Sequence, residues 1–209
     1  IVFMNGLLII DIQNDFITGS LAIDHSYSII SKINQIKTHF DIVILSQDSH
    51  PKNHISFASN NNTNIMSSKQ LTYNDIKYNQ IMWPDHCVKN SIGEKFHNEL
   101  EISNKDIVVK KGENYLIDSY SVFFDNLKLN QTNLDNILKK HNVKNLYLCG
   151  LAFDYCVKFT VIDAKELGYN VNIIKDLTES VNPEEDTNNV NKLEELNINM
   201  LTFKDIFKI

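Results

Sequence analysis

The sequence predicts an α/β fold, with a doubly wound, six-stranded and mainly parallel sheet that carries helices on both faces. Along the 209 residues, short apolar runs alternate with segments whose apolar residues have helical spacing. The runs lack the alternation of a half-exposed strand, as expected for strands that are covered on both faces. A hydrophobic content of 43% suits one domain that spans residues 1–209.

The predicted elements follow one another in a regular order. The predicted helices cover 26–38, 131–141, 155–168 and 186–196, and the third ends at Gly168, a usual helix stop. A polar, Asn-rich stretch near 59–80 interrupts the order, and we interpret it as an inserted surface loop. The predicted strands are 6–11, 41–46, 106–111, 145–150, 170–176 and 197–202.

Composition excludes several classes of partner. A formal net charge of −6 gives no electrostatic footprint for nucleic acid or an anionic membrane. All 20 basic residues are lysines, which removes bidentate arginine clamps for phosphate or carboxylate. The three cysteines form no CxxC pair, which favours a reducing compartment. With no apolar run of membrane-spanning length and no basic leader, we expect a cytoplasmic protein, with the nucleus as an alternative.

Residues with catalytic chemistry follow four of the predicted strands. In open parallel sheets the ligand site lies outside the carboxyl ends of the strands. Because these ends meet at one edge of the sheet, we expect the four segments to come together there. The residues are Asp11 after the first strand, Asp48 and His50 after the second, Lys111 after the third and Cys156 after the fourth.

Cys156 is a candidate nucleophile. It lies on the first turn of a predicted helix, and both a helix N-terminus and a nearby cation such as Lys111 lower a thiol pKa. The alternative is a small buried hydrophobe, which is our interpretation of Cys149 inside the strand. Asp11 is a candidate base, because a carboxylate among apolar side chains has a raised pKa. Its alternative is a turn-capping aspartate, a role that suits Asp15 better.

A metal site is the third candidate feature. Asp48 and His50 are two residues apart, so in extended chain their side chains point the same way. His86, in WPDHCV, is a candidate third ligand, and His54 is a further one. One carboxylate with imidazoles suits Zn²⁺, Mn²⁺ or Fe²⁺. The alternative is a set of ordinary surface histidines.

Together these stretches resemble the motifs of nicotinamidases, which belong to the isochorismatase-like cysteine hydrolases with a Rossmann-like fold. The pairing of D-x-H with W-P-x-H is the more specific mark, because it implies the nicotinamidase metal site. The matching stretches, in order, are DIQNDF, SQDSHPKNHISF, WPDHCV, KGENYLIDSYSVFFDN and GLAFDYCVKFTVIDA.

The resemblance implies a role for each matching residue. The catalytic trio would be Asp11, Lys111 and Cys156, with Lys111 preferred over Lys110 because it directly precedes Gly112. One divalent metal, zinc as first choice with iron or manganese as alternatives, would be held by Asp48, His50 and His86, with His54 ranked below them. Phe16, Trp83 and Tyr120 would line the ring pocket. After a cis peptide at Leu151–Ala152, the N–H groups of Ala152 and Cys156 would form the oxyanion hole.

The implied activity is hydrolysis of nicotinamide to nicotinate and ammonia through a cysteine thioester, within NAD salvage. Relatives are often dimers or tetramers, which makes a homo-oligomer one expectation. The chain departs from the family at Phe153, where relatives usually carry a small polar residue. Two alternatives stay open: an amidohydrolase for a ureido or carbamoyl substrate, which would generally lack the metal triad, and a noncatalytic binding relative.

Overall fold

A single six-stranded parallel sheet forms the centre of the molecule. The computed structural model describes residues 2–208. The strand order is β5-β2-β1-β6-β7-β8 and every neighbouring pair is parallel, which confirms the predicted fold class. Each predicted strand is present, with ends shifted by a few residues. The strands are β1 (Met4–Ile10), β2 (Ile42–Asp48), β5 (Ile107–Lys111), β6 (Val143–Leu151), β7 (Asn170–Glu179) and β8 (Asn199–Leu201).

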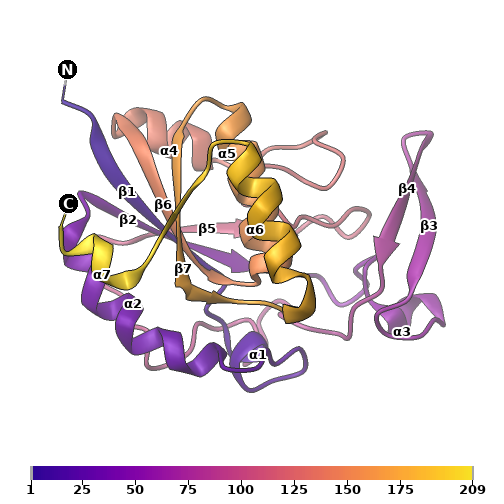
Figure 1. Cartoon of the computed structure of the whole chain (residues 1–209). Helices are drawn as coiled ribbons and strands as arrows, with labels where there is room; N and C mark the ends of the chain where they lie inside the picture. Colours follow the sequence, from indigo (N-terminus) through magenta and orange to yellow (C-terminus); the bar gives the residue numbers. More distant parts are fainter. Residues whose placement is uncertain (1, 209) are drawn as a thin grey trace.

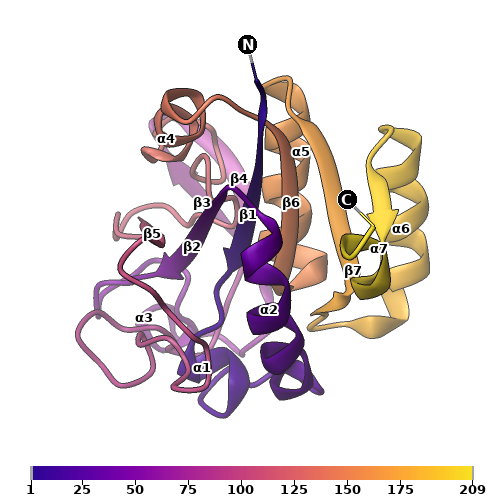
Figure 2. The ribbon, with the colours of Figure 1, turned by 90° about the vertical axis from the view of Figure 1, so that its left-hand side faces the viewer.

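Helices cover both faces of the sheet (Figures 1 and 2). One face carries α4 (Leu134–Lys140), α5 (Lys158–Glu166) and α6 (Asp186–Glu195). The other face carries α1 (Asn14–Ile17), α2 (Ile30–Ile36) and α7 (Phe203–Ile206), with short 3₁₀ turns at 26–29 and 37–39 on either side of α2 and a third at 183–185 before α6. Within residues 2–208, no helix has the length and apolar character needed to cross a bilayer.

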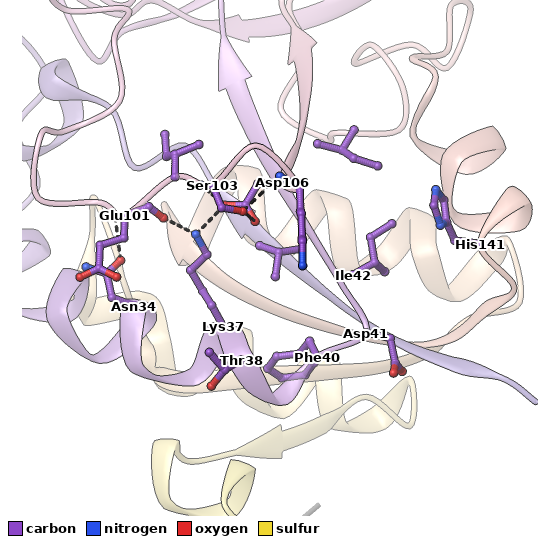
Figure 3. Close-up of a pocket in the computed structure, with 14 residues that line it drawn as sticks. Asn34, Lys37, Thr38, Phe40, Asp41, Ile42, Glu101, Ser103, Asp106 and His141 are labelled. Carbon is purple, nitrogen blue, oxygen red and sulfur yellow. Dashed lines mark hydrogen bonds and ion pairs between the residues drawn. The ribbon is translucent and has the colours of Figure 1, made fainter.

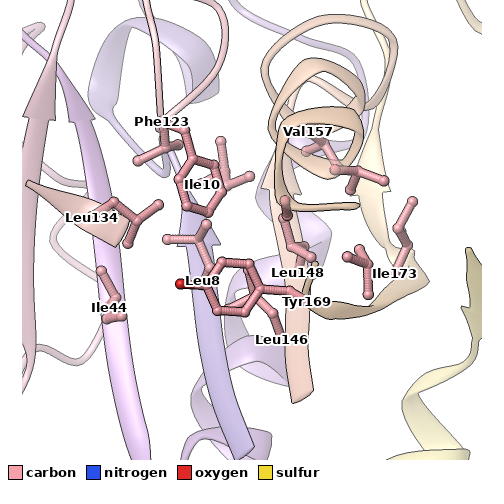
Figure 4. Close-up of a cluster of buried hydrophobic side chains, with 14 of the residues drawn as sticks. Leu8, Ile10, Ile44, Phe123, Leu134, Leu146, Leu148, Val157, Tyr169 and Ile173 are labelled. Atoms are coloured by element: carbon pink, nitrogen blue, oxygen red, sulfur yellow. The ribbon is translucent and has the colours of Figure 1, made fainter. Parts of the chain in front are cut away.

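Two apolar cores lie between the sheet and its helices. Leu8 and Ile10 of β1 pack on the α4–α5 side with Phe123 (Figure 4). Leu7 and Ile9 of the same strand pack on the opposite, α2 side. Both sets of side chains are almost fully buried. The absence of in–out alternation in the sequence therefore reflects a strand with two buried faces.

The Asn-rich stretch 59–80 is more ordered than the surface loop we expected. It contains the end of α3 (Ala58–Asn61) and an antiparallel hairpin of β3 (Ser68–Tyr73) and β4 (Ile76–Ile81), which projects beyond the sheet in Figure 1. Asn74 and Asp75 form the hairpin turn, with φ of 47° and 63°. Two left-handed residues match the twist of a two-residue hairpin, and Asn and Asp tolerate that conformation. Half of the residues of β3 and β4 are exposed and the others, except Gln80, are only half-buried, so no run of apolar residues marked the strands.

The neighbouring strands β1 and β6 mark the point where the order of strands along the sheet changes direction, although all the strands remain parallel. The two strands lie very close together there. Ile10 pairs with Gly150 in the parallel register. Gly150 has φ of +107°, and a Cβ at this position would lie 2.1 Å from the carbonyl oxygen of Ile10. Only glycine fits such an approach without moving the backbone. The chain segments that follow β1 and β6 carry Asp11 and Cys156, so this contact sets the spacing of both.

We predict that Gly150→Ala lowers the free energy of unfolding by roughly 2–5 kcal/mol, from backbone strain and overpacking together. Gly168→Ala is the matched control, because Gly168 also has positive φ (+89°) but an added Cβ there meets nothing within 4 Å. The control carries only the conformational cost, about 1–2 kcal/mol. Urea unfolding of both variants measures the difference; equal losses would show that the β1–β6 contact is not limiting.

Candidate active site

A buried ammonium group lies at the centre of the site. Lys111 ends β5 and its side chain is fully buried. Its Nζ lies 2.5 Å from Asp48 Oδ1, 3.0 Å from Asp11 Oδ2 and 3.4 Å from Cys156 Sγ. It also donates to the carbonyl oxygen of Ser119 at 3.1 Å. The structure therefore brings together the three strand ends and the helix start that the sequence pointed to.

Asp11 has the environment of a base. It is fully buried at the end of β1, in a left-handed conformation with φ of 51°. Its Oδ1 accepts a hydrogen bond of 2.7 Å from the hydroxyl of Ser46. Burial raises the pKa of Asp11 more than the Lys111 ammonium lowers it, as the sequence predicted. A carboxylate with a raised pKa accepts a proton more readily at neutral pH.

Cys156 differs from its predicted electrostatics. It lies in a π-helical turn, Phe153–Val157, that leads into α5. We expected the helix start and Lys111 to lower its pKa, but burial is the larger effect and raises the pKa well above the usual value. Lys111 acts in the opposite direction, and Asp11 and Asp48 add to the rise. The resting thiol therefore keeps its proton, with a carboxylate oxygen of Asp11 within 4.8 Å of its sulfur.

Asp48 links the nucleophile to a histidine cluster. Its Oδ1 contacts Lys111, and its Oδ2 lies 3.5 Å from Nε2 of His50. The Coulombic fields of Lys111 and His50 outweigh burial and hold the pKa of Asp48 well below its ordinary value. The side chain of Gln13 fixes the Asp48 backbone, because its Nε2 donates to the Asp48 carbonyl and its Oε1 accepts from the Asp48 N–H, both at 2.8 Å.

Three buried histidines present the same ring nitrogen. Nδ1 of His50 lies 2.9 Å from the Gly112 carbonyl, and Nδ1 of His86 lies 2.7 Å from the Pro84 carbonyl. A carbonyl can only accept, so both rings carry a hydrogen on Nδ1 and turn Nε2 toward the other ligand atoms. Nε2 of His50 faces Asp48 Oδ2, and this carboxylate outweighs burial and raises the pKa of His50. Nδ1 of His54 is paired with the Ser56 hydroxyl, and its buried Nε2 has no protein partner within the described residues 2–208.

This donor set fits one divalent cation. The ligand atoms of Asp48, His50 and His86 lie within 4.8 Å of one another, and so do those of His50, His54 and Asp118. One carboxylate with two or three neutral imidazoles is a typical set for zinc and similar ions. Burial is the main cause that lowers the pKa of His86 to about 4 and the pKa of His54 to about 3. Both imidazoles are therefore neutral at pH 7 and can bind a metal.

A narrow pocket opens onto the Cys156 thiol and is lined by one of the three histidines, His86. The three aromatic residues that the resemblance assigned to a ring pocket all line it. The rings of Trp83 and Tyr120 lie 6.3 Å apart edge to face, and Phe16 packs 5.5 Å from His86. Such a wall suits a flat aromatic ligand. The remaining lining residues are Leu21, Asp48, Asp118, Ala152, Tyr155, Cys156 and Val181.

Several buried polar residues of the site were not predicted. Ser46 lies on β2 two residues before Asp48, and Gln13 lies two residues after Asp11, so same-side spacing is a signal that could have found them. Asp118 lies in the DSYS run that we quoted only for Tyr120. It is 3% exposed and lines the pocket beside the metal-ligand residues.

Phe153 does not enter the pocket. Its side chain is fully buried in the core on the α5 side of the sheet. The ammonium of Lys175 lies over its ring, 4.1 Å from the centroid. A cation over an aromatic face is an attractive contact. Phe153 therefore packs the turn against the core on the α5 side of the sheet. The peptide bond Leu151–Ala152 just before it is cis, as the resemblance implied.

A second, larger cavity lies at the opposite, amino ends of β2 and β5 (Figure 3). Its volume is about 740 Å³. Lys37 and Asp106 pair across it at 2.6 Å, and Lys37 also donates to the Glu101 carbonyl. The Lys37 ammonium and the Asp106 carboxylate therefore neutralise each other within the cavity. Chemistry, rather than size, identifies the pocket at the carboxyl ends as the candidate active site.

Comparison with known proteins places this site in a family. Residues 5–205 match the isochorismatase domain. The chain is 44% identical to the nicotinamidase of Escherichia coli over 182 residues, which is 85% of this chain and 84% of that protein. The structure matches that of yeast nicotinamidase bound to the inhibitor nicotinaldehyde with a TM-score of 0.91 and 30% identity, covering 95% of this chain and 100% of that one. It matches a Pyrococcus horikoshii pyrazinamidase in complex with zinc with a TM-score of 0.78 and 26% identity, covering 95% and 98%.

We predict that His86→Ala reduces the affinity for a divalent metal by at least tenfold, because the ligand set then keeps only the Asp48 carboxylate and the His50 imidazole. Metal content after dialysis against limiting zinc measures this independently of activity. His97→Ala is the matched control, because His97 belongs to neither ligand cluster of the described residues. Equal metal content in both variants would contradict the assignment.

We also predict a pH effect on the stability of the metal-free protein. Burial lowers the pKa of His54 to about 3 in the fold from an ordinary value of 6.5, so the unfolded chain binds more protons between these pH values. This contribution to stability is therefore present above pH 6.5 and is lost as the pH falls. Between pH 7 and pH 5 the wild type should lose roughly 1–2 kcal/mol relative to His54→Asn, as measured by urea unfolding. A constant difference between the two proteins would refute this.

Proposed function

We propose that this chain, which belongs to the isochorismatase family, is an amidohydrolase that converts nicotinamide to nicotinate and ammonia in NAD salvage. Three relatives that are 33–44% identical over most of its length are nicotinamidases. One observation carries the proposal: a single buried ammonium, Lys111, joins Asp11 and Cys156 to the carboxylate of a metal-ligand cluster beside an aromatic pocket.

Asp11 and Cys156 perform the bond-breaking steps. Asp11 accepts the proton of the Cys156 thiol, and the thiolate attacks the carboxamide carbon. Lys111 stabilises the thiolate as it forms, because its Nζ lies 3.4 Å from the sulfur. Asp11 then returns the proton to the nitrogen, the C–N bond breaks, and ammonia leaves a thioester. In the second half Asp11 takes a proton from water, and the hydroxide attacks the thioester carbon. The C–S bond breaks, the acid leaves as nicotinate after losing its proton to solvent, and Asp11 returns its proton to the Cys156 sulfur.

The turn before α5 supplies the oxyanion site. We assign the backbone N–H groups of Ala152 and Cys156 to the oxygen of the tetrahedral intermediate. Both residues line the pocket; Ala152 directly precedes the turn Phe153–Val157, and Cys156 lies within it. Removing one such donor typically costs about 3–4 kcal/mol of transition-state stabilisation.

The other half of the pocket orients the pyridine ring. Phe16, Trp83 and Tyr120 provide apolar and edge contacts to a flat ring. Asp48, His50 and His86, with His54 as a further candidate, would hold a divalent cation, with zinc as first choice and iron or manganese as alternatives. When bound, such a cation supplies a Lewis acid for the ring nitrogen. The carboxamide then lies next to Cys156.

The two alternatives fit the site less well. An amidohydrolase for a ureido or carbamoyl substrate needs the trio but has no use for a buried carboxylate–histidine set next to aromatic rings. A noncatalytic binding module has no reason to retain a buried lysine with two carboxylates and a thiol, because burying such charges opposes folding. We extend the proposal to a homo-oligomer in the cytoplasm, which sedimentation and fractionation would test.

We predict that Cys156→Ala lowers the rate of ammonia release from nicotinamide by at least about a thousandfold, because no other thiol lies at the pocket among residues 2–208. Cys149→Ala is the matched control, since Cys149 is equally buried but lies inside β6. Chelation of the wild type should also abolish activity and added zinc should restore it.

The possible results distinguish the proposed nicotinamidase from the alternatives. Wild-type protein that hydrolyses a ureido substrate but not nicotinamide would favour the rival amidohydrolase. Selective alkylation of Cys156 that nicotinate slows would support a nucleophile in the pocket. Full activity of Cys156→Ala would refute the proposed mechanism.

A further inference from the structure

Gln80 is an unusual residue of the projecting hairpin. It is 1% exposed, whereas the other residues of β3 and β4, all within the described range, are exposed or half-buried. A buried primary amide needs partners for its hydrogens and its oxygen. Apart from the carbonyl of the next residue, Ile81, the side chain of Gln80 finds them outside the hairpin, at the wall of the substrate pocket.

The contacts of the Gln80 amide fix its orientation. Nε2 donates to Asp118 Oδ2 at 2.9 Å and to the carbonyl of Ile81 at 2.9 Å. Both partners can only accept, so the nitrogen must face them and the oxygen must face the other way. On that side, Oε1 lies 3.4 Å from Nδ2 of Asn126.

The same amide meets the ring wall at Tyr120. The two hydrogens of Gln80 Nε2 are shared among three acceptors, because the Tyr120 hydroxyl also lies 3.1 Å from this nitrogen. The same hydroxyl accepts a hydrogen bond of 3.2 Å from Nε1 of Trp83. Asn126 closes the network, because its Oδ1 accepts from the backbone N–H of Tyr120 at 2.9 Å. Three residues that line the pocket, Asp118, Tyr120 and Trp83, are therefore tied together through one side chain from the hairpin.

The hydroxyl of Tyr120 is left as a hydrogen-bond donor. Burial, with Asp118 as the next cause, raises the pKa of Tyr120 well above its ordinary value, so the hydroxyl keeps its hydrogen. Its two neighbours, Trp83 Nε1 and Gln80 Nε2, are both donors and cannot accept that hydrogen. Within residues 2–208 it has no acceptor. The wall of the pocket thus combines a fixed carboxylate with a donor hydroxyl.

We propose that Gln80 is a positioning residue of the ring pocket: by holding the Asp118 carboxylate and the Tyr120 hydroxyl in place, it makes the β3–β4 hairpin part of the substrate site. The inference rests on the proposed function for its effect on substrate affinity. Its effect on pocket geometry stands independently of the substrate.

The chain carries its own reporter for this geometry. Trp83 is the single tryptophan, and it is 3% exposed. Loss of the Gln80 amide frees Tyr120, which is the hydrogen-bond partner of Trp83. We expect Gln80→Ala to shift the tryptophan emission to longer wavelength as water reaches the indole. For nicotinamide, we expect roughly a tenfold rise in KM with kcat changed less than about threefold, because the reacting trio is untouched.

Two further variants control the test. Asn79→Ala changes the exposed neighbour on the same strand and should leave emission, KM and kcat as in the wild type. Gln80→Glu places a carboxylate against Asp118. At pH 8 the two like charges should raise KM as alanine does.

Wild-type emission and KM in Gln80→Ala would overturn the inference. A loss in Asn79→Ala as large as that in Gln80→Ala would also overturn it, because the effect would then belong to the hairpin's stability. Absence of nicotinamide hydrolysis by the wild type would refute the proposed function instead, and the emission comparison would still decide the role of Gln80.

Discussion

The site depends on a lysine ammonium that is buried away from water. Such a group is costly unless its charge is matched and its hydrogens are accepted. Asp48, Asp11 and the Ser119 carbonyl meet both needs for Lys111, at 2.5, 3.0 and 3.1 Å. The strong pairing leaves Asp48 ionised, whereas burial raises the pKa values of both Asp11 and Cys156. One proton is thus retained between base and nucleophile until a substrate needs it.

The sheet supplies this arrangement through its register. Asp48 and Lys111 are direct partners across the parallel β2–β5 pair, and Ile10 and Gly150 are partners across β1–β6. Left-handed residues at the strand ends then turn the chain into the site. Gly112, with φ of +71°, lets its carbonyl reach His50, and an added Cβ there would lie 2.4 Å from the imidazole. Regular strands thus bring the groups close, and single residues with unusual backbone conformations aim them.

The sequence was sufficient where a signal is local or periodic. Uninterrupted apolar runs predicted the strands, and the rule that sites lie at carboxyl strand ends predicted the meeting of Asp11, Asp48, Lys111 and Cys156. The sequence was insufficient where a property, such as a pKa, depends on the balance between opposing electrostatic effects. The Cys156 pKa depends on how far burial exceeds the field of Lys111, which no motif encodes. The hairpin was missed because its residues are exposed or only half-buried apart from Gln80, which is polar, so the strands carry no buried apolar run.

Spacing could have marked a single residue such as Ser46, but the pairing of side chains from distant segments was beyond sequence reasoning. Ser46 on Asp11 and Gln80 on Asp118 are pairs separated by 35 and 38 residues, and neither belongs to a motif with its partner. They become visible only when each buried polar atom is matched with its partner in three dimensions. Such residues determine how rigidly a catalytic group is held, so they matter for the activity as much as the groups that motifs reveal.

The central claim is that the Cys156 sulfur carries the acyl group during turnover. Rapid acid quenching of wild-type protein with excess nicotinamide, followed by intact-mass measurement and peptide mapping, tests it most directly. The account predicts a transient mass increase of one nicotinoyl group, located on the peptide that contains Cys156. Steady nicotinate production with no adduct at any quench time, or an adduct on another residue, would contradict it.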